Sequence, residues 1–553
     1  MSCIPAAYLP PKDLWPQRVY SLPEFQAYPQ RLNSTEELLD KQVAAGKGER
    51  TAILFEDKRI PYQAVLATVN RLGAALKRLG IAECDRVLLR LPNIPPAVLA
   101  NFAIIKIGGV SVPTSALFSR AEIAHVANLA EAKAAIVAGP LLEEYEQARP
   151  NLATVQHTIL VGGTAEQQAA WKAKGYLLWQ ELVAAERPEC NPVRRDRLDV
   201  SVLLFTSGTT GLPKGTAHFM EEALIVPDGF GRYCWNVQET DVIGGSAPIA
   251  MAAGYSAVAT IPYRFGAAVS LLARFTPEAM FETIQNHKVT ILSILPTAYR
   301  KMLQVPDAPT KYDLSSLRLC TGGGESLTAQ TYHDWKNKFN LEIYEGLGTT
   351  EMMFVFISSA ATKQVKPGSI GPAIPGYRLK VLSPDTKQEC RGAETGMLMV
   401  QGPTGTVYWR DPDKQRSVVL DGWVKAGDMV SMDEDGYIWF LSREDDLIKS
   451  SGYRIGPEEI EDVLVTHPAV FDAGVVGTPD PIMGQRTVAY VALRPGVAAS
   501  EALKQEIVDF CRGKVAVYKL PREIVVVPEM PRTITGKLLR RVLRDRTTGV
   551  AKA

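Results

Sequence analysis

The sequence predicts an α/β protein with a large N-terminal domain and a small α+β C-terminal lobe. As far as about residue 350, short apolar runs that end in glycine or serine alternate with helical patterns. This alternation is typical of βαβ units in a mostly parallel sheet. After about residue 370, short strand patterns are separated by turn residues, which indicates antiparallel strands. After residue 445 the pattern changes once more, to a small unit of mixed helices and strands.

The bulk composition is that of an ordinary globular protein with several domains. A chain of 553 residues is too long for one compact domain and suggests two to four. Hydrophobic residues make up 46% and charged residues 22%, as in typical globular proteins. The formal net charge of +1 gives no strong field for nucleic acid or an anionic membrane, so we expect neither as a partner. Any bound nucleotide must therefore be held by a local site.

The cysteines and the hydropathy pattern set the expected environment. No CxxC or CxxH spacing occurs among the seven scattered cysteines, which are Cys3, Cys84, Cys190, Cys234, Cys320, Cys390 and Cys511. This argues against a disulfide framework and against a zinc site, and favours a reducing compartment. The N-terminal stretch MSCIPAAYLPPKDLWP has no basic region followed by an apolar core, so no signal peptide is expected. No apolar run is long enough for a membrane span.

The N-terminal elements can be placed in order. The first 35 residues are rich in proline and aromatic residues and are expected to lie extended across a surface. A helix is predicted from residue 62, because one helical stripe carries Val65, Val69, Leu72, Leu76 and Leu79. The run RVLLRL is then a strand, and PAVLANFAIIKIGG is a helix that ends at its two glycines.

The later elements follow the same patterns. Strands are predicted at AAIVAG, HTILVGG, SVLLFTSG, VTILSILP, LRLCTGGG and LEIYEGLG. The helix GPEEIEDVLVTHP begins with Pro457 and two acidic residues. It opens the final unit, which continues with VAYVAL, a helix at 500–512 and EIVVV. We therefore predict an N-terminal domain over residues 1–444 and a C-terminal lobe over residues 445–553.

The stretch 203–215, LLFTSGTTGLPKG, is the strongest candidate site. An apolar strand runs into small hydroxyls, glycines and one lysine, Lys214. A phosphate needs donors from several directions: glycines let backbone N–H groups turn towards it, hydroxyls add donors, and the lysine adds charge. The spacing is not the Walker A pattern, because no serine or threonine follows the lysine. The stretch indicates a polyphosphate loop; the alternative is a surface turn after a strand.

Further stretches carry signals that are weaker when each is taken alone. Glu351 follows a strand and a turn in YEGLGTTE, and a carboxylate beside a triphosphate can hold Mg²⁺. Three glycines follow a strand in CTGGGESL, where a flat adenine could approach the backbone. Asp428 could accept hydrogen bonds from ribose hydroxyls, and Lys537 stands in the basic tail PRTITGKLLRR. The alternatives are a solvated glutamate, a turn aspartate and an exposed lysine. The stretch 441–461 adds Arg443, Asp445, Asp446, Lys449 and Gly452.

The order of these motifs carries a family resemblance. With all five in this order, the sequence resembles the adenylate-forming superfamily of acyl-CoA synthetases, firefly luciferase and peptide-synthetase adenylation domains, over roughly residues 35–545. Within the superfamily, EGLGTTEM and TPEAMFETIQNHKVTILSILPTAYRKML resemble benzoate-CoA and 2-aminobenzoate-CoA ligases. The opening YLPPKDLWP also resembles the 2-aminobenzoate group.

The resemblance implies a fold, an activity and a set of cofactors. The N-terminal domain would hold two parallel-type α/β sheets and a small distorted β-barrel, and the C-terminal lobe would be mobile. ATP and a carboxylic acid would give an acyl-adenylate and pyrophosphate, after which the thiol of coenzyme A would displace AMP. ATP, Mg²⁺ and CoA are thus the implied cofactors, and a cytoplasmic monomer or homodimer is expected.

The resemblance also assigns the nucleotide contacts. The β- and γ-phosphates would be embraced by Thr206, Ser207, Gly208, Thr209, Thr210, Gly211 and Lys214. The adenine slot would be lined by Gly322, Gly323, Gly324, Glu345, Gly346 and Leu347, with Leu347 against the ring face. Beyond the slot follow Gly348, Thr349, Thr350 at the α-phosphate and Glu351 at Mg²⁺. The ribose would be bound by Asp428 and Arg443.

Two lysines of the C-terminal lobe would serve the two chemical steps in turn. Lys537 matches the family's adenylation lysine, whose ammonium offsets the repulsion between a carboxylate and the α-phosphate and the charge of the transition state. The lobe would close to deliver this side chain and then rotate about a hinge at Asp445. Rotation would bring Lys449, Ser451 and Gly452 to the site, where the glycine would let pantetheine pass close to the backbone.

The acyl pocket is expected around APIAMAAGYS and beyond the Glu351 loop, with Ala250, Met251, Gly254, Tyr255 and Phe354 as pocket residues. Many relatives carry an aromatic residue or a histidine near Met251, and benzoate-type relatives have a histidine in place of Phe354, so this pocket is more apolar. Plain core packing is the alternative for both positions. A 2-amino or 2-hydroxy substituent needs a buried polar partner, for which Tyr255, His218 or backbone groups could serve. We expect an aromatic or compact cyclic acid, with an unsubstituted ring favoured.

Three alternatives stay open at this point. One is a short- or medium-chain fatty acyl-CoA synthetase, and another is an adenylating enzyme that loads a separate carrier protein. CoA-dependent thioester formation would decide between a ligase and a carrier-loading enzyme. The third is a non-catalytic nucleotide-binding relative, against which the intact Lys537, Lys449, Glu351 and Arg443 speak.

Overall fold

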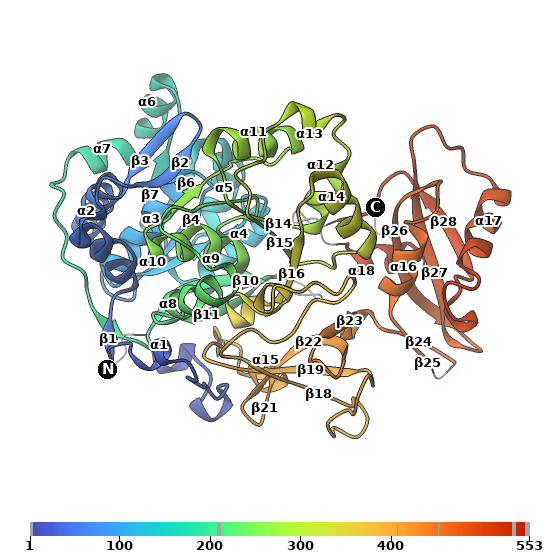
Figure 1. The fold of residues 1–553 in the computed structure, drawn as a ribbon. Coiled ribbons are helices and arrows are strands. Elements are labelled where there is room, and N and C mark those ends of the chain that lie inside the picture. Colours follow the sequence, from blue (N-terminus) through green and yellow to red (C-terminus); the bar gives the residue numbers. More distant parts are fainter. Residues whose placement is uncertain (1–3, 207–211, 406, 452, 533–537, 548–553) are drawn as a thin grey trace.

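A computed structural model describes residues 4–206, 212–405, 407–451, 453–532 and 538–547. Within these residues the strands form two eight-stranded sheets, two five-stranded sheets and one two-stranded sheet. Figure 1 shows the two large sheets and their helices in one body, a small antiparallel unit beneath it, and a C-terminal lobe at its side. The predicted fold class is therefore confirmed.

The first large sheet has the strand order β20-β11-β10-β5-β4-β6-β7-β8 and carries the predicted phosphate loop at the β10–β11 turn. Its strands are β4 (Arg86–Arg90), β5 (Val110–Pro113), β6 (Ala132–Ala138), β7 (His157–Val161), β8 (Leu177–Leu178), β10 (Val200–Thr206), β11 (Lys214–Phe219) and β20 (Val407–Tyr408). The helices that precede or connect them are α2 (Tyr62–Arg78), α3 (Pro95–Lys106), α4 (Arg120–Ala130), α5 (Leu142–Ala148), α6 (Ala165–Ala173) and α7 (Trp179–Ala184). Strands β4 to β8 and β10 pair in parallel, as the sequence predicts, whereas β10–β11 and β11–β20 pair antiparallel.

The second large sheet has the order β17-β16-β15-β14-β12-β13-β2-β3. Its strands are β2 (Thr51–Phe55), β3 (Lys58–Pro61), β12 (Val242–Gly245), β13 (Ala268–Ser270), β14 (Ile291–Ile294), β15 (Leu319–Gly323), β16 (Ile343–Gly348) and β17 (Val355–Ser358). Helix α8 (Glu222–Val226) follows and contacts β11 of the first sheet. The helices of the second sheet are α9 (Ala252–Ala259), α10 (Ile261–Phe265), α11 (Pro277–His287), α12 (Pro296–Leu303), α13 (Ala308–Lys311) and α14 (Ala329–Phe339). The parallel strands β14, β15 and β16 end together, which gathers their following loops at one edge of the sheet.

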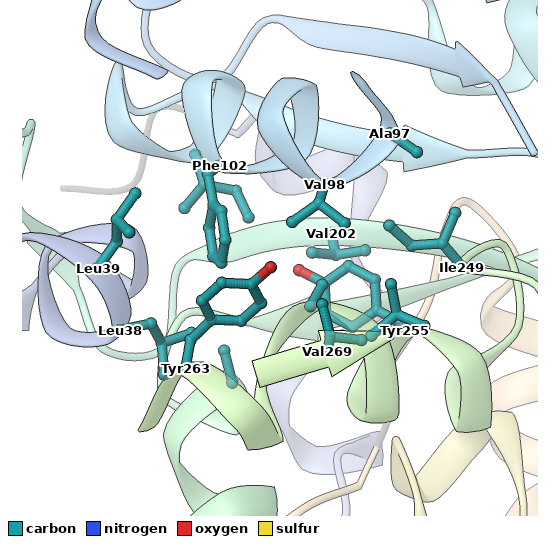
Figure 2. Packing of buried hydrophobic residues seen from close by; sticks show 14 of the residues in the cluster. Leu38, Leu39, Ala97, Val98, Phe102, Val202, Ile249, Tyr255, Tyr263 and Val269 are labelled. Atoms are coloured by element: carbon teal, nitrogen blue, oxygen red, sulfur yellow. The ribbon is translucent and has the colours of Figure 1, made fainter. Parts of the chain in front are cut away.

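Helix α3 lies in the main hydrophobic core. Nearly all of its residues are buried, which explains why the helix is apolar on every side. In Figure 2, Val98 and Phe102 of this helix face Tyr255 of α9 and Tyr263 of α10. The rings of Phe102 and Tyr263 meet edge to face, with centroids 4.8 Å apart. This packing joins the first sheet's helices to those of the second.

The N-terminal segment is more buried than a surface strap would be. It forms α1 (Pro23–Gln26), whose Phe25 is fully buried, and β1 (Arg31–Leu32), which pairs with β9 (Arg195–Asp196). The guanidinium of Arg18 lies 2.5 Å from the Glu222 carboxylate, and the side chains of both are less than a tenth exposed. The expectation of a segment that merely crosses the surface is thus only partly right, because a buried charge pair anchors it.

The small antiparallel unit follows the two large sheets. It consists of β18 (Arg378–Leu382), β19 (Gly396–Gln401), β21 (Val419–Leu420), β22 (Trp423–Met432) and β23 (Ile438–Arg443), with α15 (Pro412–Val418) beside them. All its pairings are antiparallel, which confirms the prediction for this stretch.

The C-terminal lobe has a sheet and a hydrophobic core of its own. Its strands are β24 (Ile448–Ser450), β25 (Tyr453–Ile455), β26 (Val470–Asp480), β27 (Gly484–Leu493) and β28 (Glu523–Val527). Its helices are α16 (Pro457–Leu464), α17 (Glu501–Cys511) and α18 (Arg540–Thr547). A boundary between residues 444 and 445, with a hinge at Asp445, stays a prediction.

Two sequence-based expectations concern the whole chain. Cys84 is disulfide-bonded, which is one observation against a fully reducing environment; the cysteines found free are Cys190, Cys234, Cys320, Cys390 and Cys511. Among the described residues, no helix combines the length and the apolar character that crossing a membrane requires.

Candidate active site

The ends of the predicted phosphate loop lie side by side. Thr206 ends β10 and Lys214 begins β11, and the two residues are partners in the antiparallel ladder. The Nζ atom of Lys214 lies 3.1 Å from Oδ2 of Asp411, the residue that precedes α15. The ammonium is therefore held at the loop's end, a third exposed. The other predicted phosphate contacts, Ser207, Gly208, Thr209, Thr210 and Gly211, fall outside the described residues.

The glycines predicted to form the adenine slot lie where two strands approach closely. Gly323 on β15 is paired with Gly346 on β16. A Cβ atom added at Gly323 would lie only 2.6 Å from the Gly346 carbonyl oxygen, so no other residue fits there without a shift. Gly324 has a φ of +88°, which other residues rarely adopt. Gly322, next to them, is paired with Glu345. The strand ends thus bring bare backbone together at the predicted adenine slot.

Glu345 lies beside the predicted adenine slot, and its carboxyl group binds a backbone N–H of a neighbouring loop. Its Oε1 atom accepts a hydrogen bond of 2.9 Å from the backbone N–H of Leu327. Burial raises the pKa of the Glu345 carboxyl to about 8. Leu347, two residues on, is half-buried and packs against the hydrophobic cluster of the small antiparallel unit.

The loop after β16 turns sharply around Glu351. Thr349 accepts a hydrogen bond of 3.3 Å from Met352 N–H and so caps the short 3₁₀ helix Thr350–Met352. At Gly348, a Cβ atom would lie 2.4 Å from the Phe354 carbonyl oxygen. The hydroxyl of Tyr408, on β20, donates a hydrogen bond of 2.5 Å to Oε1 of Glu351. The turn therefore carries the Glu351 carboxylate from the second sheet to the edge strand of the first.

The predicted ribose residues form an ion pair. Asp428 on β22 and Arg443 on β23 are partners in the antiparallel ladder. Nη1 of Arg443 donates to Oδ1 of Asp428 at 2.6 Å and to the Ala426 carbonyl at 3.2 Å. The negative charge of Asp428 is the main cause that raises the pKa of Arg443, and Glu351 adds to it. Asp428, Arg443 and Glu351 therefore share one electrostatic environment.

The predicted acyl-pocket stretch forms the start of α9. Met251 is the residue before this helix, and Ala250 beside it is buried. Gly254 is obligatory, because a Cβ atom there would lie 2.0 Å from the Pro248 carbonyl oxygen. Tyr255 is buried, as Figure 2 shows, and its hydroxyl accepts a hydrogen bond of 3.3 Å from the Asn101 amide. Asn101 is a polar neighbour that sequence reasoning missed.

Phe354 lies in an aromatic cluster that the sequence did not predict. Its ring meets Phe230 edge to face at 5.0 Å between centroids, and Trp235 at 6.0 Å. All three side chains are buried. No spacing rule connects these residues, because the two stretches are more than a hundred positions apart and meet only in the folded chain.

His218 is not available to a substituent on the substrate. Its Nδ1 atom lies 2.7 Å from Oε2 of Glu222, and its Nε2 atom lies 3.3 Å from the Thr216 hydroxyl. Both ring nitrogens are engaged and the side chain is fully buried. Of the two side chains that the sequence offered as polar partners, only Tyr255 stays a candidate.

Part of the predicted thioester machinery lies on the lobe's β24–β25 hairpin. Lys449 is exposed on β24, and its backbone N–H donates to the Gln485 side chain at 2.7 Å. Ser451 has a φ of +49° in the turn. Asp445, the predicted hinge, lies in a short 3₁₀ helix. Gly452 falls outside the described residues.

The lobe touches the nucleotide-site loops near the predicted adenylation lysine. Lys537 falls outside the described residues, but Arg532 and Leu538 on either side of its segment form an isolated β-bridge. Nη1 of Arg532 lies 3.8 Å from Oε2 of Glu325, the residue after Gly324. The chain on both sides of the lysine segment thus lies at the glycine end of β15.

The donor set fits Mg²⁺ bound together with a substrate phosphate. Within the described part of the chain, no group of three or more His, Cys, Asp or Glu side chains could hold a metal ion. Mg²⁺ is commonly bound by one or two carboxylates, phosphate oxygens and waters. The single half-buried carboxylate of Glu351, beside the ribose ion pair, has this chemistry.

Comparison with known proteins shows the family of the chain. A family model of AMP-binding enzymes matches residues 39–409, and one of the AMP-binding enzyme C-terminal domain matches residues 459–537. Benzoate–CoA ligase of Thauera aromatica is 32% identical over 94% of this chain and 96% of its own length. Acetyl-coenzyme A synthetase of Bacillus subtilis is also 32% identical, over 93% of this chain and 90% of its own.

Solved structures agree as well. The anthranilate CoA ligase AuaEII in complex with anthranoyl-AMP superposes with a TM-score of 0.89 at 30% identity, covering 95% of this chain and 99% of that one. A benzoate CoA ligase from Burkholderia xenovorans LB400 superposes with a TM-score of 0.84 at 28% identity, covering 93% and 100%. The chain belongs to the AMP-binding enzyme family, the adenylate-forming superfamily.

Proposed function

We propose that this protein is a carboxylate–CoA ligase whose acid is aromatic, or compact and cyclic. The general reaction follows from the family: the protein is an AMP-forming acid–thiol ligase that uses ATP, Mg²⁺ and CoA. The observation that supports the substrate class is the buried cluster of Phe354, Phe230 and Trp235, which makes the surroundings of the predicted pocket residue Phe354 aromatic and apolar. The similarity to a benzoate–CoA ligase supports the same substrate class.

The nucleotide would be held by both sheets and the small antiparallel unit. Thr206 and Lys214 stand at the two ends of the phosphate loop and would bind the β- and γ-phosphates. Asp428 would accept hydrogen bonds from the ribose hydroxyls while its hydrogen bond from Arg443 holds the carboxylate in place. Glu351 would hold Mg²⁺, which neutralises phosphate charge when it is bound.

The lobe would supply the moving groups. The ammonium of Lys537 would bridge the substrate carboxylate and the α-phosphate, which offsets their mutual repulsion. A rotation about Asp445 would then replace Lys537 by the hairpin that carries Lys449, Ser451 and Gly452. Such a motion separates the two half-reactions in time.

A second candidate substrate class has support of its own. An acetyl-coenzyme A synthetase and a mitochondrial acyl-coenzyme A synthetase of Rattus norvegicus are 32% and 31% identical to this chain, as close as the benzoate enzyme. A short or medium fatty acid would fill the same apolar space.

Pyrophosphate exchange across a panel of acids tests the proposal. We expect benzoate, or a compact ring such as cyclohexanecarboxylate or furoate, to give kcat/KM at least about tenfold above butyrate and octanoate; one misplaced methylene group costs about tenfold or more in an apolar pocket. A preference for butyrate or octanoate would overturn the ring assignment. CoA-dependent release of AMP distinguishes a ligase from an enzyme that loads a carrier protein.

Alanine substitution of the two lysines tests the division of labour. Lys537→Ala should lower adenylate formation by about a hundredfold or more, while a supplied acyl-adenylate still reacts with CoA. Lys449→Ala should leave adenylate formation intact and slow the reaction of a supplied acyl-adenylate with CoA. Equal loss of both half-reactions in either variant would refute its assigned role.

A further inference from the structure

The contact between Tyr408 and Glu351 joins two parts of the chain that the proposed mechanism does not otherwise connect. The phenol oxygen lies 2.5 Å from Oε1 of Glu351. Among the described residues, Tyr408 is the one side chain that donates a hydrogen bond to this carboxylate, and the second oxygen, Oε2, has no protein partner there. A carboxylate with one oxygen engaged and one left over is suited to hold a cation with the second.

The backbone around Tyr408 is fixed on several sides. Tyr408 pairs with Thr216 of β11, and its N–H donates to Oε1 of Gln415 at 2.8 Å. The next residue, Trp409, donates its N–H to the Gly215 carbonyl at 2.9 Å. The side chain of Tyr408 is almost fully buried. The phenol therefore stands on the strand paired with β11, whose first residue is Lys214.

The direction of the hydrogen bond follows from the chemistry. An ionised carboxylate can only accept, so the phenol must donate. The phenol is buried and its backbone is held by the contacts above, so the hydroxyl stays within reach of Oε1 of Glu351. The donor is thus permanent, whereas a glutamate on a surface turn would sample several rotamers.

We propose that Tyr408 is a positioning residue that holds the carboxylate of Glu351 in the orientation in which it binds the Mg²⁺ of the ATP complex. The inference rests on the proposed function, in which Glu351 is the metal ligand. Groups behind a metal ligand fix its orientation, and their loss typically costs 10- to 100-fold in metal affinity. Since Tyr408 belongs to the first sheet and Glu351 to a loop of the second, the hydrogen bond also sets the metal ligand relative to the phosphate loop.

Tyr408→Phe tests this proposal, because it removes one oxygen and leaves the ring. Binding of Mn²⁺ to the full-length protein with α,β-methylene-ATP, followed by electron paramagnetic resonance, reports the metal site without turnover. We expect the dissociation constant of Mn²⁺ to rise about tenfold or more. Binding of AMP, which needs no metal, should stay within about twofold and shows that the groove is intact.

A matched control is available elsewhere in the chain. Tyr28 is also buried, and its hydroxyl donates to Oδ2 of Asp228 at 2.8 Å. Tyr28→Phe makes the same chemical change away from the site and should leave the Mn²⁺ affinity unchanged. An equal loss of affinity in both variants would mean a general loss of packing and would overturn the inference.

Glu351→Gln separates the inference from the function on which it rests. If Glu351→Gln leaves the Mn²⁺ affinity unchanged, the metal assignment itself is wrong. If Glu351→Gln weakens Mn²⁺ binding and Tyr408→Phe does not, only the role of Tyr408 fails. With both correct, the double variant should bind Mn²⁺ no more weakly than Glu351→Gln alone. Should Tyr408→Phe lose AMP binding, Tyr408→Met, which adapts to the same space, repeats the measurement.

Discussion

At the scale of single residues, Glu345 beside the predicted adenine slot is a buried acid. Its carboxyl lies within β16 and accepts one hydrogen bond, from Leu327 N–H. Burial raises its pKa from 4.5 to about 8. The folded protein therefore holds a proton that the unfolded chain releases. Because the folded state binds more protons between these two values, the contribution of Glu345 to stability falls as the pH rises through that window.

The variant Glu345→Gln should flatten this pH dependence. Glutamine keeps an oxygen for Leu327 N–H and has no proton to lose. We expect the melting temperature of the native protein to fall from pH 5 to pH 8 more steeply than that of the variant, with a difference on the order of a few kcal/mol in unfolding free energy. Calorimetric scans across this range measure it.

The control for that experiment is Glu434→Gln. Glu434 is exposed, so Glu434→Gln should leave the dependence of the melting temperature on pH as it is in the native protein. Asp462, whose pKa is raised to about 7 mainly by burial, keeps part of the slope in every variant. Parallel curves for Glu345→Gln and the native protein would contradict the assignment.

At the scale of elements, the strands at the candidate site can be predicted from the sequence. The contacts between side chains of different sheets cannot. The apolar runs and their glycines predicted β10, β14, β15 and β16, because burial on both faces leaves a local pattern. The stripe from Val65 to Leu76 predicted α2 in the same way. Glu351 and Tyr408 are 57 positions apart in the sequence, and their hydrogen bond depends on how the two large sheets pack together. No local sequence pattern can therefore predict it.

The close pairing of β15 and β16 at Gly323 and Gly346 yields a prediction for one methyl group. Gly323→Ala would place its Cβ 2.6 Å from a carbonyl oxygen of the neighbouring strand, which must then move. We expect a cost of about 1–3 kcal/mol, seen as a lower melting temperature, together with weaker AMP binding.

The neighbouring residue supplies the control for this substitution. A Cβ atom at Gly322 would lie 3.4 Å from the nearest side chain, an ordinary contact, so Gly322→Ala should melt much closer to the native protein. Equal melting temperatures for Gly323→Ala and the native protein would show that the strands separate without cost.

At the scale of the whole molecule, the orientation of the lobe is marked by ion pairs with the N-terminal domain. Arg532 lies between Asp472 of the lobe, at 2.7 Å, and Glu325 of the domain, at 3.8 Å. Arg300 of α12 lies 3.5 Å from the same glutamate. Arg454 and Asp385 form a second pair across the boundary, at 2.7 Å. Family resemblance predicted a lobe that moves, but the residues that hold one orientation come only from the structure.

Loss of the Glu325 charge should affect one half-reaction more than the other. Glu325 accepts a hydrogen bond of 2.6 Å from the Thr297 N–H. Glu325→Gln keeps an oxygen for this hydrogen bond and removes the negative charge that attracts Arg532. We expect pyrophosphate exchange to fall about three- to tenfold, the worth of one partly buried ion pair. Thioester formation from a supplied adenylate should be unchanged, because in the proposed mechanism that step uses the other orientation of the lobe.

The control is Glu501→Gln on α17, whose glutamate pairs only with Lys504 of the same helix among the described residues. This variant should be native in both steps. A fall in both half-reactions of Glu325→Gln would mean that the residue supports the glycine loop and not the lobe's orientation.

The buried pair of Arg18 and Glu222 bears on how far the chain can be trimmed. The family match begins at residue 39, so a chain cut there would look complete by homology. It would lose the arginine that pairs with Glu222, whereas Glu221 would keep its ion pair with Arg197. A carboxylate stripped of its counterion in that setting costs several kcal/mol. Arg18 lies before the start of the family match, yet its ion pair with Glu222 helps to stabilise the sheet that carries the phosphate loop.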